Sequence, residues 1–107
     1  MNFKGSLPLL ILQILSEGPN HGYQIGKLIR ERSNDVLDFR EGTLYPALRN
    51  LNEEGLISIV EGERGRRRRR SYRLTDEGAR NLMARRQEWV AYVSAVESVL
   101  ASGSSER

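Results

Sequence analysis

The sequence predicts a mainly α-helical chain with one small β-hairpin, an α+β fold, and three of its stretches support this prediction. Residues 42–54 place three leucines on one face of a helix, and Gly55 follows where a helix can end. Residues 56–61 and 69–74 have strand composition and enclose a turn. Residues 76–101 carry apolar side chains at heptad spacing, which is typical of a long helix that packs against a partner.

Length and composition restrict the possible classes of protein. The chain has 107 residues, enough for a single hydrophobic core, and it contains no cysteine, which excludes a disulfide framework and a thiolate metal site. Its longest apolar run, residues 7–12, is too short to span a bilayer, and residues 1–6 lack the pattern of a signal peptide. We therefore expect a cytoplasmic protein that has no contact with membranes.

The sequence contains no recognisable catalytic set. His21 is the only histidine, and the chain offers neither a glycine-rich phosphate loop nor a paired nucleophile and base. A turn or capping role for His21 is the simpler interpretation. We expect no enzyme activity, no metal site and no cofactor.

The first helix is expected over residues 7–17, with Ser6 as its N-cap and Pro8 in its first turn. Its apolar side chains cover nearly every side of the helix, which leaves two interpretations open. It is either an unusually hydrophobic core helix, or a helix whose second face packs against a partner subunit. We favour the partner, with Leu9 and Leu12 at the interface.

Two further helices joined by a short linker indicate a helix-turn-helix. Asn20 can cap a helix over residues 21–33, and residues 36–40 lead from it to the helix over residues 42–54. The hairpin that follows then has the position of a wing. We expect a winged helix-turn-helix.

The outward face of the helix over residues 42–54 carries side chains suited to DNA. Arg49 can form paired hydrogen bonds with guanine and Asn50 with adenine, while Thr43 and Tyr45 can donate to phosphates near the helix start. The alternative is that an exposed helix face carries polar residues without any function. The candidate DNA contacts on this helix are Thr43, Tyr45, Pro46, Arg49 and Asn50.

The hairpin concentrates positive charge. Residues 63–73 contain seven arginines and one glutamate, a local charge of +6, so the remainder of the chain carries −3 within the total of +3. A local basic patch on a mildly acidic chain is typical of nucleic-acid contact, although an isolated charge run can also be a solvated face. The hairpin tip, residues 63–68, is expected to contact phosphates or the minor groove. The arginines expected there are Arg64, Arg66, Arg67 and Arg68.

The last helix is expected over residues 76–101, with Thr75 as its N-cap. A helix this long needs a partner for its apolar stripe, and the simplest partner is a second copy of the chain. Trp89 has two interpretations: an interface core residue, or one wall of a cleft between subunits that accepts flat aromatic ligands by stacking. The expected interface residues on this helix are Leu82, Trp89, Val93, Val96 and Leu100.

Together, three spaced motifs resemble the PadR family of bacterial transcription regulators over about residues 7–100. They are HGYQI at residues 21–25, GTLYPAL at 42–48 followed by EGLI at 54–57, and YRLT at 72–75 with Gly78. The resemblance implies a winged helix-turn-helix and a homodimer joined through the first and last helices. It also implies repression at a roughly palindromic operator, with release on ligand binding.

A single C-terminal helix makes the chain similar to the short members of that family. Some of those members hold an aromatic ligand against a tryptophan on this helix, and Trp89 is similar in position. The wing differs, because family members often have a Gly-Gly-Arg-Arg-like segment where this chain has five consecutive arginines at residues 66–70.

These observations divide the chain into a DNA-binding domain (residues 1–75), a dimerisation helix (76–101) and a disordered tail (102–107). We expect a dimeric repressor that binds double-stranded DNA, with a small aromatic effector as a candidate ligand. The alternative is a basic dimeric module that binds an acidic protein surface, and a ligand carrier without DNA affinity is a third interpretation. The polar face over residues 42–54 argues against the interaction module, because a protein that grips an acidic surface does not need base-reading side chains.

Overall fold

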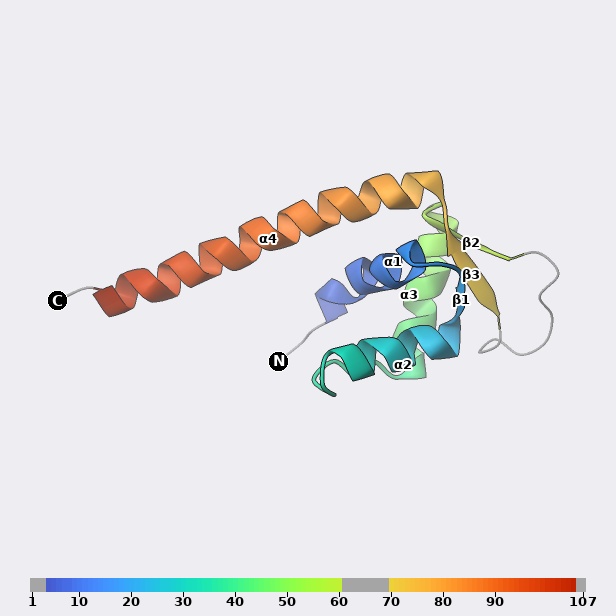
Figure 1. The fold of residues 1–107 in the computed structure, drawn as a ribbon, viewed down its shortest axis with the longest axis horizontal. Helices are drawn as coiled ribbons and strands as arrows, with labels where there is room; N and C mark the ends of the chain where they lie inside the picture. The colour runs from blue at the N-terminus through green and yellow to red at the C-terminus, as the bar shows by residue number, and fades with distance from the viewer. Residues whose placement is uncertain (1–3, 61–69, 106–107) are drawn as a thin grey trace.

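The computed structural model describes residues 4–60 and 70–105 (Figure 1). Within these ranges, apolar stripes separated by turn residues form four α-helices and a three-stranded antiparallel sheet. This confirms the predicted α+β class. In chain order the elements are the 3₁₀ helix η1 (Lys4–Ser6), α1 (Leu7–Ser16), β1 (Asn20–His21), α2 (Gly22–Arg32), α3 (Glu41–Glu53), β2 (Ile57–Ile59), β3 (Ser71–Leu74) and α4 (Asp76–Ser105).

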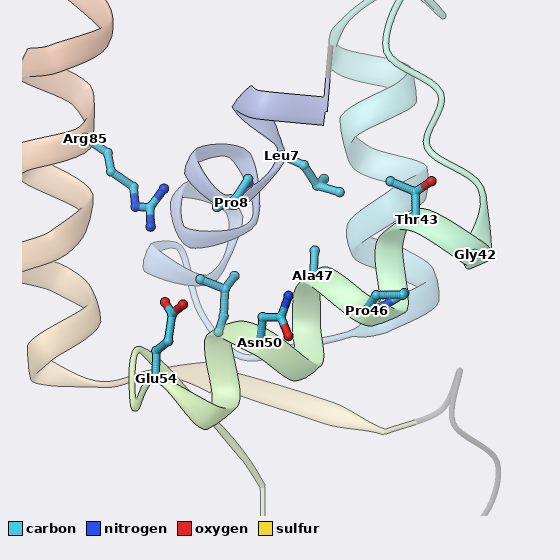
Figure 2. A pocket seen from close by; sticks show the side chains of 10 residues that line it. Leu7, Pro8, Gly42, Thr43, Pro46, Ala47, Asn50, Glu54 and Arg85 are labelled. Atoms are coloured by element: carbon cyan, nitrogen blue, oxygen red, sulfur yellow. The ribbon is translucent and has the colours of Figure 1, made fainter. Parts of the chain in front are cut away.

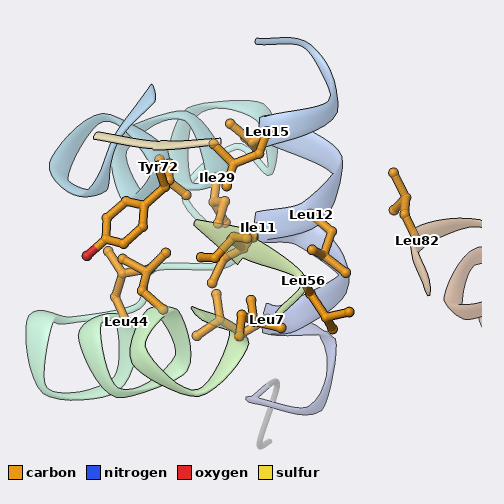
Figure 3. Close-up of a cluster of buried hydrophobic side chains, with 14 of the residues drawn as sticks. Leu7, Ile11, Leu12, Leu15, Ile29, Leu44, Leu56, Tyr72 and Leu82 are labelled. Carbon is orange, nitrogen blue, oxygen red and sulfur yellow. The ribbon is translucent and has the colours of Figure 1, made fainter. Parts of the chain in front are cut away.

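The core lies where α1, α2, α3 and the sheet meet. Figure 3 shows Leu7, Ile11 and Leu15 of α1 converging on the same space as Leu44 of α3 and Tyr72 of β3. All five are buried. Burying a large aliphatic side chain stabilises a fold by roughly 1.5–3 kcal/mol, so this cluster, together with Ile25 and Ile29 of α2, holds the two helices of the helix-turn-helix against α1.

Helix α1 serves mainly the core of its own protomer. The Leu12 side chain is 0% exposed and Leu82 of α4 is also buried, so the prediction that these two residues contact a partner subunit was wrong. They are covered because α1 packs against the first part of α4. Leu9 is only partly buried and stays available to a partner.

The sheet contains one strand more than the predicted hairpin. Its order is β1-β3-β2, with His21 opposite Ser71 and Ile57 opposite Leu74. Asn20, expected as a helix cap, is instead part of β1, and its side-chain oxygen accepts the backbone N–H of His21 at 2.9 Å. The predicted hairpin tip, residues 63–68, lies outside the described residues.

The helix ends show which capping predictions were correct. Ser6 forms no side-chain cap, because the chain enters α1 from η1 with Ser6 already helical at φ −91° and ψ −8°. Thr75 does cap α4: its Oγ1 accepts the Gly78 N–H at 3.0 Å. Gly55 has φ +79°, the left-handed conformation expected after α3. Helix α4 continues to Ser105, so residues 102–105, predicted to lie in a disordered tail, are helical.

A hydrogen-bonded chain on the surface ties α2 and α4 to α1. Arg32 of α2 donates from both terminal nitrogens to the Glu17 carboxylate at 2.8 and 2.9 Å. Gln13 donates to the same carboxylate and accepts from Arg86 of α4 at 3.0 Å. The hydrogen bonds from Arg32, and then from Gln13, lower the pKa of Glu17 from 4.5 to about 2.

This lowered pKa makes part of the stability depend on pH. Because the folded-state pKa of Glu17 is below its unfolded value, the stabilisation is present above about pH 4.5 and is lost as the pH falls toward 2. We expect Glu17→Gln to reduce the free energy of unfolding at neutral pH, and the difference from wild type to shrink between these pH values. Urea unfolding across a pH series measures this difference, and Arg32→Gln should remove the same pH-dependent part. A difference independent of pH would contradict the role of the ion pair.

Candidate nucleic-acid interface

Helix α3 has a buried face and an exposed face, as its leucine spacing predicted. Its three leucines lie in the core. Of the predicted DNA contacts, Arg49 and Asn50 are exposed, and Thr43 and Pro46 are half-buried. The chain therefore presents one guanidinium and one carboxamide, the two groups best suited to paired hydrogen bonds with base edges, on neighbouring positions of one helix.

Tyr45 was predicted on the outward face of this helix, and that placement was wrong. Its side chain is only 6% exposed and belongs to the core. The ring fits there because Gly22, at the start of α2, has no side chain: a Cβ at Gly22 would lie 2.8 Å from Tyr45 Cε1. Tyr45 thus packs α3 against α2, and we no longer count it among the DNA contacts.

The base of the wing is fixed to the start of α2. The backbone N–H of Gly22 donates to the Arg70 carbonyl at 3.2 Å, and the Ser71 hydroxyl lies 3.0 Å from His21 Nδ1. Arg70 and Arg73 are exposed on this part of the hairpin. The four arginines predicted to contact DNA, Arg64, Arg66, Arg67 and Arg68, lie outside the described residues.

Two accessible side chains near this surface were not selected from the sequence. Tyr23, in the first turn of α2, is 56% exposed. Arg40 is exposed directly before α3, and its carbonyl accepts the N–H groups of Thr43 and Leu44 at 2.9 and 2.8 Å. The position of Tyr23 off the Ile25–Ile29 stripe was the signal that could have identified it.

Beyond its first turns, α4 leaves a row of large apolar side chains uncovered. Trp89 is 47% exposed, and Val96 and Leu100 are exposed as well, whereas Val93 is half-buried. The Trp89 ring lies 6.1 Å from that of Tyr92 between centroids. Leu9 and Trp89 also line a cavity of about 180 Å³ between the start of α1 and α4.

No helix in the described part of the chain is long and apolar enough to cross a membrane. Within residues 4–60 and 70–105, no three His, Asp or Glu side chains are grouped so that they could hold a metal ion.

The model of the transcriptional regulator PadR-like family matches residues 11–84. The chain belongs to this family. This is a family of transcription regulators and not of enzymes. The winged helix-turn-helix predicted from the sequence is thereby confirmed.

Individual relatives match at moderate identity. Transcriptional regulator YqjI of Escherichia coli strain K12 is 37% identical over 84 residues, which cover 78% of this chain and 39% of that protein. The chain thus spans about two-fifths of the length of this curated relative. An uncharacterised protein of Lysinibacillus sphaericus is 30% identical over 87 residues, 80% of both proteins.

Solved structures of PadR-type regulators share the fold. A transcriptional regulator from Clostridium thermocellum has a TM-score of 0.79 at 33% identity, covering 88% of this chain and 89% of that one. A PadR family regulator from Clostridium difficile has a TM-score of 0.73 at 33% identity, covering 90% and 99%. Bacillus subtilis PadR, solved in complex with operator DNA, has a TM-score of 0.60 at 28% identity, covering 78% and 46%.

Proposed function

We propose that this PadR-like chain is a sequence-specific DNA-binding repressor that acts as a homodimer. The observation that carries the proposal is the exposed Arg49–Asn50 pair on α3, directly before a strand that leads into an arginine-rich wing. This is the order of a recognition helix and a wing. The complex of the related Bacillus subtilis PadR with operator DNA supports the same use of the fold here.

In this proposal, α3 enters the major groove and the wing follows the phosphate backbone. Arg49 and Asn50 read base edges, while Thr43 and Pro46 lie against the groove wall. The arginines of the wing supply affinity that does not depend on sequence. Tyr23, exposed at the start of α2, is a further candidate donor to a phosphate.

The homodimer is proposed because α4 displays apolar side chains that its own protomer does not cover. A row of exposed large residues on a 30-residue helix marks a protein contact, and a second copy offers the same row. Leu9 extends this surface onto α1. In this proposed dimer, Trp89 and its symmetry mate bind a flat aromatic effector by stacking, and the bound effector releases the DNA.

Selection from a pool of random duplex DNA tests this function. A dimer with two recognition helices should enrich a roughly palindromic sequence whose half-sites lie about one helical turn, on the order of 34–36 Å, apart. Recovery of DNA without any shared sequence would contradict specific recognition and favour the rival, a basic module directed at an acidic protein surface.

Arg49→Ala is expected to weaken binding to the selected site by roughly 1–3 kcal/mol and to relax discrimination at one base pair of each half-site. The reason is the loss of a bidentate contact, which only the matching base can form. Fluorescence anisotropy on a set of single-base operator variants measures both effects, and Glu53→Ala, exposed at the end of the same helix, is the matched control. An equal loss for every operator variant would show that Arg49 contacts only the backbone.

A further inference from the structure

A cavity of about 370 Å³ lies between the start of α1, the flank of α3 and the first half of α4 (Figure 2). This volume is within the range of pockets that hold small molecules, about 300–1,000 Å³. It adjoins the smaller cavity beside Trp89 and shares Arg85 with it, but neither Trp89 nor Tyr92 lines the larger cavity.

One end of this cavity holds two opposite charges that do not neutralise each other. Figure 2 shows Arg85 of α4 and Glu54, at the end of α3, projecting toward the same end. Arg85 Nε donates to the Asn81 side chain, but its terminal nitrogens bond no described residue. The Glu54 carboxylate likewise has no ion-pair partner in the described part of the chain. A ligand that carries both a carboxylate and an ammonium group satisfies both side chains at once.

The rest of the cavity is mainly apolar. Pro8 and Ala47 line it, and the buried Leu7 and Leu51 side chains form part of its floor. An aliphatic, thioether or aromatic side chain gains free energy there by leaving water. The wall residue Ala47 is small, which keeps the space open.

Part of the cavity wall also belongs to the proposed DNA-reading face of α3. Thr43, Pro46 and Asn50 line the cavity, and the same three residues are candidate DNA contacts. The Asn50 carboxamide cannot hold a ligand and form paired hydrogen bonds with adenine at the same time. Occupation of the cavity therefore competes with base reading.

From this arrangement we propose that the cavity between α1, α3 and α4 binds a free α-amino acid with an apolar side chain, and that the bound amino acid lowers affinity for the operator. Arg85 pairs with the ligand carboxylate, Glu54 with its ammonium group, and the side chain lies along Pro8 and Ala47. The regulatory half rests on the proposed DNA-binding function. The binding half does not.

Calorimetric titration of the full chain without DNA tests the binding half. L-leucine, L-methionine and L-phenylalanine are the probes, and the N-acetyl derivative and the amide of each amino acid (such as N-acetyl-L-leucine and L-leucinamide) lack one of the two charges. We expect saturable binding of at least one free amino acid, and at least tenfold weaker binding of both of its charge-deleted derivatives. Absence of binding by all three amino acids, or equal binding of N-acetyl-L-leucine and L-leucine, would overturn the proposal.

Variants locate the site. Arg85→Gln and Glu54→Gln should each weaken amino-acid binding at least tenfold, whereas their neighbours Arg86→Gln and Glu53→Gln should leave it unchanged, because neither neighbour lines the cavity. Ala47→Leu should abolish binding by filling the space, with thermal unfolding as the check that the fold persists. Unchanged affinity in both Arg85→Gln and Glu54→Gln would place the ligand elsewhere.

Operator binding with and without the amino acid tests the regulatory half. We expect the bound amino acid to weaken operator binding by wild type and to have no effect on Ala47→Leu. Amino-acid binding without any change in operator affinity would overturn the regulatory half alone. A chain that binds the amino acid but no DNA would refute the proposed function and leave the site intact.

Discussion

Gly78→Ala is expected to destabilise the protein by roughly 3 kcal/mol, although alanine is the better helix former. A Cβ at Gly78 would collide with the Leu56 carbonyl oxygen and lie 2.8 Å from Leu74 Cδ1. The carbonyl cannot move away easily, because it accepts the Thr75 N–H, and the Thr75 hydroxyl donates to the Gly55 carbonyl at 2.6 Å. These bonds fix the start of α4 against the end of α3, so the collision strains the junction between them.

Urea unfolding measures this effect, and Gly42→Ala is the matched control. Gly42 also lies in a helix, but nothing is within 4 Å of the position its Cβ would occupy. We expect Gly42→Ala to leave the stability unchanged or to raise it by up to about 1 kcal/mol. If Gly78→Ala were as stable as wild type, the start of α4 would not pack against the Leu56 carbonyl as it does in this structure.

The triple variant Arg66→Ala, Arg67→Ala and Arg68→Ala is expected to lose most of the salt-dependent part of DNA binding. A dimer would lose up to six phosphate contacts, so the slope of log affinity against log salt should fall by about 5. The loss should be similar for operator and unrelated DNA, since phosphates carry no sequence information. Anisotropy titrations between about 50 and 200 mM salt measure the slope.

The control for this variant removes the same charge from another place. Arg80, Arg85 and Arg86 lie on α4 and outside the arginine run of residues 66–70, and their replacement by alanine changes the net charge equally. It should leave the slope close to that of wild type. A wing variant with an unchanged slope would mean that these arginines do not contact phosphates.

Local signals in the sequence predicted the helices and the ends of two of them. The leucine spacing of α3 selected its buried face, and Thr75 and Gly55 have the cap and the left-handed conformation expected of them. Such features depend on residues within one helical turn. The sequence therefore contains the information needed to predict them.

Features that depend on distant partners were missed. Strand β1 has two residues and exists because it pairs with β3, about 50 residues further along the chain, so it has no periodicity of its own. Tyr45 is buried because Gly22 of another helix leaves room for its ring. Leu12 is buried because α4 folds back along α1. Helical periodicity cannot distinguish a second core face from a surface for a partner subunit.

Footprinting the purified protein on the DNA upstream of its own gene, at near-physiological salt, tests the repressor proposal most directly. We expect one bounded, roughly palindromic protected site with two half-sites about one helical turn apart. Uniform weak coverage, or none, would contradict specific recognition by α3. The basic wing would then be a non-specific or protein-directed patch.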